Sequence, residues 1–423
     1  MDTSKKNSLL ACIGAGLEYY DFIVYGLMAE VLSFLFFASD SSYVAQLKTF
    51  AVFSVGYIAR PLGGIIFGIL SDSIGRKKSF LIVMYAMAFS TLFIGLLPTY
   101  NQVGILAPIG LVILRIIQGI SFGAELPGAV TIVYESSGKQ KISSYMGFVI
   151  SSVGIGSILA SLILYMLNIS YTKEEILQGF WRFPFLFGGT LAIINAFIRK
   201  HLKETNDNIS KSFTLSPLTS LLRNRFSELI LGIGLTWSLS SLIIFYLYLP
   251  TFLKTHYSFS SETIYSSITV GLIWSAITLP ICGKLADKIN KNIFFCLSCF
   301  ISVFIIYNLF FLLDYANNIS LFIFAACYQT LISFLSVSYF PIIASLFLSS
   351  SRNTGIALIY NCTYSIMAFL PLFITWILNK IAPNSLAILF SLNCLISGIS
   401  CLVLTLKNKY KDKLFETVNE PAN

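Results

Sequence analysis

Charged residues are scarce in this chain of 423 residues: Asp, Glu, Lys and Arg make up 11% of it, and only two residues are histidine. An ordinary soluble domain carries about 25% charged residues. Hydrophobic residues account for 56% of the chain, which is more apolar surface than water can solvate. This composition excludes a soluble globular protein and indicates a chain that crosses a lipid bilayer.

Groups of residues that bind metal are also missing. His201 and His256 fall in polar loop segments, and Cys296-x-x-Cys299 has no second cysteine pair or histidine beside it. Zinc sites built on cysteine need such a second pair of ligands. No nucleophile–base pair stands out either. We therefore expect no enzymatic activity, no metal and no other cofactor.

Long hydrophobic runs are what the chain has instead. About twelve of them are long enough to cross a membrane as helices, at roughly 20 residues each. One long polar segment separates the sixth run from the seventh. We therefore predict an all-α membrane protein of twelve transmembrane helices, with an N-terminal six-helix half (1–199), a central loop (200–227) and a C-terminal six-helix half (228–423). The runs cover 9–37, 45–70, 79–97, 103–133, 143–166, 183–199, 228–252, 264–283, 292–313, 319–347, 353–379 and 384–406.

Basic residues indicate the orientation of these spans. The net charge of +9 comes from Lys and Arg in short loops between apolar runs, not from one basic face, so we expect no nucleic-acid partner. Most of the 28 basic residues fall on the side that also holds the N-terminus. Because basic loops stay on the cytoplasmic side, we expect both termini to be cytoplasmic.

Five charged side chains interrupt the apolar runs of the first half: Glu18, Asp21, Arg60, Arg115 and Glu125. A charge at membrane depth persists only if it faces a partner or a polar path. Two bases cannot neutralise three acids, so either one acid is protonated at rest or a cationic or zwitterionic solute completes the balance. This imbalance favours proton coupling through the three acids. A purely structural role, in which Arg60 and Arg115 pin helices together through ion pairs, stays open.

A short motif occurs once in each half. Gly68-x-x-x-Asp72 closes the second run and Gly283-x-x-x-Asp287 closes the eighth, each followed by basic residues. The first copy, extended through Gly75-Arg76-Lys77, resembles the loop signature of the major facilitator superfamily, although Ser73 stands where the family has an arginine. The resemblance implies that a conformational latch is formed by Gly68, Asp72, Gly75, Arg76, Lys77, Gly283 and Asp287.

Further motifs are similar to those of the metabolite–proton symporter family, which includes proline/betaine, dicarboxylate and shikimate transporters. They are Gly14-x-x-x-Glu18-Tyr19-Tyr20-Asp21-Phe22-x-x-Tyr25-Gly26, Arg60-Pro61-Leu62-Gly63-Gly64, Arg115-x-x-Gln118-Gly119, Trp181-Arg182-x-Pro184-Phe185 and Arg352-x-x-Gly355-x-x-x-x-Tyr360-Asn361. The resemblance spans nearly the whole chain. It implies a multi-pass transporter of a bacterial-type inner (plasma) membrane that moves a small-molecule solute together with a proton, with an oligomeric state that the sequence leaves open.

The resemblance and the buried charges together give a candidate site. We expect Glu18, Asp21 and Glu125 to take part in proton coupling. We expect the solute to contact Arg60, Arg115, Gln118, Tyr25, Tyr360 and Asn361. A zwitterionic osmolyte such as proline or betaine is the first choice, because aromatic faces attract ammonium groups. A di- or tricarboxylate resembling 2-oxoglutarate is the alternative, because arginines bind carboxylates bidentately. A non-transporting membrane sensor is the alternative from a different class.

Overall fold

A computed structural model describes residues 16, 19–21, 23–37, 41–64, 66, 76–123, 125–136, 141–200, 221–257, 259–378, 380 and 382–419. Within these ranges the regular structure is helical and no strand occurs. Each of the twelve predicted spans contains a described helix. The predicted all-α fold class is confirmed.

The longer helices before residue 201 fall on the first six predicted spans, and short helical turns lie between them. The first span is bent: Tyr19–Leu27 and α2 form a pair at an angle of 67°. α7 and α8 together make one apolar stretch, Leu106–Glu135, that is long enough to cross a membrane. The elements are α2 (Ala29–Phe36), α3 (Ser42–Ile58), α5 (Arg76–Leu96), α6 (Tyr100–Val103), α7 (Leu106–Phe122), α8 (Glu125–Ser136), α9 (Ile142–Ser170), α10 (Lys173–Glu175), the π-helical turn Ile176–Phe180 and α11 (Arg182–Lys200).

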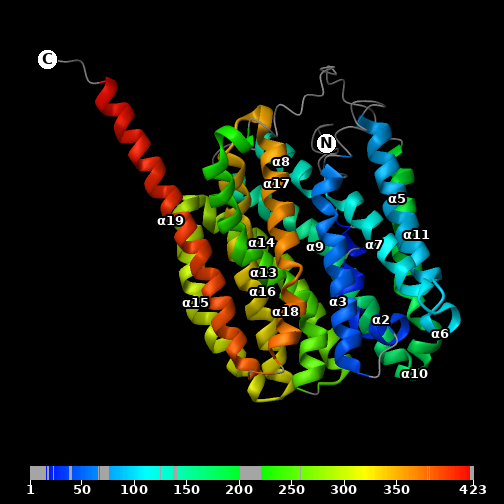
Figure 1. Ribbon diagram of the computed structural model, residues 1–423. Helices are drawn as coiled ribbons and strands as arrows, with labels where there is room; N and C mark the ends of the chain where they lie inside the picture. The colour runs from blue at the N-terminus through cyan, green and yellow to red at the C-terminus, as the bar shows by residue number, and fades with distance from the viewer. Residues whose placement is uncertain are drawn as a thin grey trace.

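The helices after residue 220 fall on the last six predicted spans. They are longer and more regular than those of the first half, and α19 projects beyond the bundle at the upper left of Figure 1. The elements are α13 (Phe226–His256), α14 (Ser261–Lys288), α15 (Lys291–Asp314), α16 (Asn318–Ser345), α17 (Ser349–Met367), α18 (Leu370–Ile377), the 3-10 turn Pro383–Ser385 and α19 (Leu386–Asn419). The predicted central loop lies mostly on residues outside the described ranges.

The outer surface of the bundle is apolar. Eight described helices are long and apolar enough to cross a membrane, and the bent pair adds a ninth candidate. Large hydrophobic side chains point outward along them: Phe304 is 74% exposed, Ile319 is 72% exposed and Leu106 is 65% exposed. Apolar surface of this extent needs lipid rather than water around it. The chain is therefore a membrane protein.

Glycines bring α3 and α7 into close contact in the first half. A methyl group at Gly119 would lie 2.0 Å from the carbonyl oxygen of Gly56, and one at Gly123 would lie 2.0 Å from that of Arg60. Only glycine allows two helix backbones to approach so closely. This packing fixes the depth of Arg60 relative to Arg115 on the facing helix.

Helices α9 and α14 join the two halves of the chain. Both run through the centre of the bundle in Figure 1, between the blue and cyan helices on the right and the yellow and red helices on the left. The Ser161 hydroxyl lies 2.7 Å from the Thr269 hydroxyl, and Ser151 donates a hydrogen bond to the carbonyl oxygen of Ala276 at 2.9 Å. Side-chain hydroxyls thus hold together two helices that are more than 100 residues apart.

Candidate functional site

The predicted site residues that the structure describes are buried. Asp21, Arg115 and Gln118 are 0% exposed and Arg60 is 1% exposed; Tyr25, Tyr360 and Asn361 are also buried. Glu18, Gly68, Asp72 and Gly75 lie outside the described residues. For Glu125, Arg76 and Lys77 the described part covers the helix backbone but not the side chain. Asp21, Tyr25, Arg60, Arg115 and Gln118 thus lie in the interior of the first half, and Tyr360 and Asn361 lie in the interior of the second half.

The guanidinium of Arg60 lies between two aromatic rings. Its Cζ atom is 3.8 Å from the centre of the Tyr57 ring and 4.4 Å from the centre of the Phe122 ring. The rings of Tyr19 and Phe122 are 5.5 Å apart. Cation–π contacts use the faces of a guanidinium, whereas hydrogen bonds to a planar anion use its edge.

Two tyrosines of α17 extend this group across the boundary between the halves. Tyr364 stacks on Tyr57 with ring centres 6.3 Å apart, and Tyr360 lies 4.3 Å from Tyr364. Because these rings are buried and little water competes for a cation there, a cation is attracted more strongly to their negative faces than it would be at an exposed site. We call the group formed by Tyr19, Tyr57, Phe122, Tyr360 and Tyr364 the aromatic cluster.

The amide of Asn361 lies beside the aromatic cluster. Its Nδ2 atom donates a hydrogen bond to the carbonyl oxygen of Gly123 at 2.6 Å, which fixes the orientation of the amide. Its Oδ1 atom is buried and accepts no hydrogen bond from any residue that the structure describes. A buried acceptor left over in this way is costly unless a donor arrives. Asn361 can therefore accept from an N–H group of a bound solute.

Arg115 reaches into the interior of the first half by a different route. Its Cζ atom is 4.0 Å from the centre of the Tyr25 ring. Its Nη1 atom donates to Oε1 of Gln118 at 3.0 Å, and Nε2 of Gln118 donates to Oγ1 of Thr91 at 2.8 Å. Thr91 belongs to α5, so these bonds connect α7 to α5.

The carboxyl group of Asp21 faces α11. A methyl group at Gly188 of that helix would lie 2.5 Å from Oδ1. Neither carboxyl oxygen makes a hydrogen bond of good geometry within the described part of the chain.

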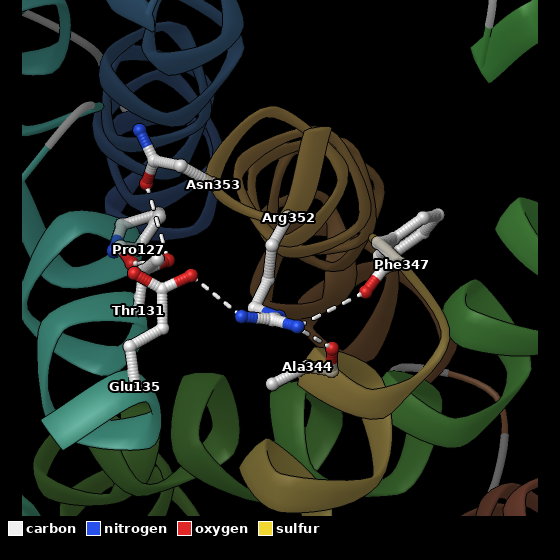
Figure 2. A network of polar contacts seen from close by, with 7 residues as sticks. All are labelled: Pro127, Thr131, Glu135, Ala344, Phe347, Arg352 and Asn353. Atoms are coloured by element: carbon white, nitrogen blue, oxygen red, sulfur yellow. Dashed lines mark hydrogen bonds and ion pairs between the residues drawn. The ribbon is translucent and has the colours of Figure 1, made fainter. Parts of the chain in front are cut away.

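One set of contacts closes the bundle at the end that holds Arg352, as Figure 2 shows. Arg352 at the start of α17 forms an ion pair with Glu135 at the end of α8, with 2.5 Å between Nη1 and Oε1. Its Nε atom also donates to the carbonyl oxygen of Ala344 at 3.0 Å. Thr131 Oγ1 lies 3.4 Å from Oδ1 of Asn353. We call this end of the bundle the Arg352 end.

The second latch motif lies at the same end. Asp287 at the end of α14 accepts hydrogen bonds from the backbone amides of Ser143 and Ser144, in the first turn of α9. A methyl group at Gly283 would lie 2.6 Å from the carbonyl oxygen of Ser143. The acid and the glycine of this motif thus dock the second half against the first half.

A separate set of contacts closes the opposite end. Lys254 of α13 forms an ion pair with Glu30 of α2, with 3.1 Å between Nζ and Oε1. The hydroxyl of Tyr265 donates to the carbonyl oxygen of Leu27 at 2.9 Å. We call this end the Lys254 end. Contacts between the halves therefore exist at both ends of the bundle, and either set can open only if its ion pair separates.

Sequence reasoning did not single out Thr91, Tyr57 or Tyr364 as site residues. Thr91 is a polar residue within an apolar run, and that was the signal available for it. Tyr57 and Tyr364 carry no such signal, because aromatic residues make up 15% of the chain.

Comparison with known proteins gives a consistent result. The family model for the Major Facilitator Superfamily matches residues 11–371. A Staphylococcus aureus protein named "Putative proline/betaine transporter" is 31% identical over 420 residues, covering 95% of this chain and 88% of the relative. The alpha-ketoglutarate permease of Escherichia coli is 28% identical over 370 residues, covering 85% of this chain and 84% of the permease.

A solved structure shares the fold. The crystal structure of a D-xylose-proton symporter has a TM-score of 0.70 to this chain at 18% sequence identity, and the match covers 94% of this chain and 95% of the symporter. The two proteins therefore share a fold over nearly their whole length.

Proposed function

The chain belongs to the Major Facilitator Superfamily, and on that premise we propose that it is a proton-coupled symporter that takes up a zwitterionic osmolyte such as proline or betaine. Residues 1–199 and 228–423 are the two halves that move in this proposal, with residues 200–227 as the connecting loop. The solute is exposed alternately at the Arg352 end and at the Lys254 end. Both termini lie on the cytoplasmic side.

One arrangement carries the choice of solute: the guanidinium of Arg60 stands within the aromatic cluster beside the unused acceptor of Asn361. The edge of Arg60 suits the carboxylate of the solute. The faces of the tyrosines suit its ammonium group, and Oδ1 of Asn361 suits an N–H of that group. A zwitterion offers both charges at the short separation that this arrangement needs.

Asp21 is the proton carrier in this proposal. It is fully buried, and its carboxyl group lies against the uncharged Gly188 of α11. An acid in such surroundings is stable when neutral and becomes stable as an anion when water or a cation reaches it. Opening one end of the bundle brings water to it, so proton uptake and release can follow the opening.

The experiment that tests this proposal is uptake into proteoliposomes. Labelled proline, betaine and 2-oxoglutarate are each supplied with and without an imposed pH gradient. We expect proline or betaine to accumulate only with the gradient. Accumulation of none of the three, or accumulation that ignores the gradient, would contradict the proposal.

A dicarboxylate is the second candidate. The permease relative named above supports it, and so does the presence of two buried arginines. Accumulation of 2-oxoglutarate without proline or betaine in the same panel would select this candidate and reject the zwitterion. Specific binding of a solute without any transport would select a membrane sensor.

A further inference from the structure

We propose that the side-chain oxygen of Asn361 selects among zwitterionic solutes according to whether their ammonium group carries an N–H. A solute with an N–H, such as proline, is preferred, and a quaternary solute, such as betaine, is disfavoured. The inference rests on the proposed transport of a zwitterion and narrows the class of solute. It is carried by the orientation and the burial of the Asn361 amide.

The orientation of this amide is fixed by a carbonyl group of the first half. Nδ2 of Asn361 donates to the carbonyl oxygen of Gly123 at 2.6 Å. In a continuous helix this carbonyl would accept from the residue four positions later, but that residue is Pro127, which has no N–H. If the amide turned over, Oδ1 would face the carbonyl oxygen, and two acceptors form no hydrogen bond. The oxygen of Asn361 therefore stays on the side away from Gly123.

The Asn361 amide lies where α17 is held against the first half. A methyl group at Gly123 would lie 2.0 Å from the carbonyl oxygen of Arg60, so the amide is bonded to a residue that packs directly on α3. One turn further along α17, Ser365 donates to the carbonyl oxygen of Tyr57 at 2.7 Å. These two bonds place Oδ1 of Asn361 at the boundary between the halves, beside the aromatic cluster where the solute is proposed to bind.

Only a hydrogen-bond donor can use this oxygen. Asn361 is 2% exposed, and its Oδ1 accepts no hydrogen bond from any residue that the structure describes. A buried acceptor without a donor costs free energy. A bound solute recovers that free energy only if it brings an N–H to the oxygen.

Zwitterions differ in what they offer to this oxygen. The ammonium group of proline carries N–H bonds, whereas the nitrogen of betaine is bonded only to carbon. The aromatic cluster attracts both solutes, because cation–π attraction acts on quaternary ammonium ions as well. A methyl group of betaine gives Oδ1 only a C–H contact, which is a weak hydrogen bond. A site that bonds an N–H of its solute rejects an analogue without one, because the acceptor is then left unpaired.

The test is competition against labelled proline for equilibrium binding to the full-length protein in detergent. The competitors are proline, N-methylproline and N,N-dimethylproline, which share the ring and the carboxylate and differ in N–H bonds; only the last has none. We expect N-methylproline to bind within about 3-fold of proline and N,N-dimethylproline to bind roughly 10- to 100-fold more weakly, as for a buried acceptor left unpaired. Equal binding of all three would overturn the inference. So would a loss of affinity that is complete at N-methylproline, because it would identify the size of the methyl group as the cause.

Two variants separate the hydrogen bond from the size of the solute. Asn361→Leu removes the acceptor and keeps a similar bulk, so we expect N,N-dimethylproline to bind within about 3-fold of proline. Ser365→Ala is the matched control, because it removes the neighbouring bond from α17 to α3 and keeps the amide; it should retain the wild-type ratio of affinities. A wild-type ratio in Asn361→Leu, or the same loss of the ratio in Ser365→Ala, would overturn the inference. The wild-type series decides the inference even if Asn361→Leu does not fold.

Uptake by the wild-type protein in proteoliposomes separates the two possible failures. If it accumulates neither proline nor betaine with an imposed pH gradient, the proposed function is wrong and the inference falls with it. If it accumulates betaine as readily as proline, the proposed function stands and only the role of Asn361 is wrong.

Discussion

Asp287 accepts hydrogen bonds from the backbone amides of Ser143 and Ser144, at 2.8 and 2.9 Å, across the boundary between the two halves of the chain. The amides of a first helical turn have no partner within their own helix and carry partial positive charge. A carboxylate from the other half therefore serves as the N-terminal cap of α9. Closure of the Arg352 end depends on this cap.

Loss of this cap should open the Arg352 end. We expect Asp287→Ala to lower stability by about 1 kcal/mol, the usual value of an N-terminal cap, and to increase labelling by thiol reagents of a cysteine introduced at that end of a cysteine-free protein. The stability and the labelling of Asp287→Asn should fall between those of the wild type and those of Asp287→Ala. Lys284→Ala, at an exposed position one turn earlier on α14, is the control. Equal labelling of Asp287→Ala and Lys284→Ala would reject the role of the cap.

The two ion pairs should act in opposite directions on the conformation. We expect Arg352→Ala to favour opening of the Arg352 end and Lys254→Ala to favour opening of the Lys254 end, each by up to about 1 kcal/mol, because partly exposed ion pairs are individually weak. Distances between spin labels at each end provide the measurement. The charge reversal that combines Glu135→Arg with Arg352→Glu should restore part of the wild-type distribution, because it re-forms the ion pair but not the hydrogen bond to the carbonyl oxygen of Ala344. If both single variants shift the distribution of conformations in the same direction, the two ion pairs do not close opposite ends of the bundle.

The aromatic support of Arg60 can be tested at Tyr57. We expect Tyr57→Phe to keep wild-type solute affinity, because the ring face over Arg60 remains. Tyr57→Leu should weaken binding roughly 5- to 30-fold, which corresponds to about 1–2 kcal/mol for a desolvated cation–π contact. Equilibrium binding of labelled proline in detergent measures both. Unchanged affinity in Tyr57→Leu would mean that the rings only fill space.

Neutralising Asp21 should separate exchange from accumulation. We expect Asp21→Asn to abolish accumulation against a gradient and to retain counterflow, because the amide cannot release a proton but keeps the size of the buried side chain. Uptake and counterflow on the same vesicles give the comparison. Accumulation at the wild-type level would exclude Asp21 as the proton carrier and leave Glu18 or Glu125 for that role.

Much of this architecture could be predicted from the sequence. The apolar runs set the number and order of the helices, because a span needs a fixed length of apolar chain. Charges such as Arg60 and Arg115 could be placed in the interior, because lipid does not tolerate them. The glycines that let α3 approach α7 stand at the spacing expected of close helix pairs.

The partners of the buried charges could not be predicted in the same way. Counting charges does not say which neighbours face these groups: in the structure the Arg60 guanidinium lies against the rings of Tyr57 and Phe122, and the Asp21 carboxyl faces Gly188. These contacts depend on the direction in which each side chain points around the axis of its helix. That direction depends on helix bends, such as the 67° bend after Leu27, that composition does not encode.

The contact between Glu135 and Arg352 was hidden for another reason. The two residues are 217 positions apart, and each reads as an ordinary charge at the end of a helix. Only the packing of one half against the other brings them together at one end of the bundle.

Proton movement on addition of solute tests the central claim most directly. Wild-type proteoliposomes that enclose a pH-sensitive dye receive unlabelled proline or betaine without any imposed gradient. The account predicts acidification of the interior on addition of the transported solute, and none in Asp21→Asn vesicles. Entry of solute into wild-type vesicles with no change of internal pH would contradict proton-coupled symport.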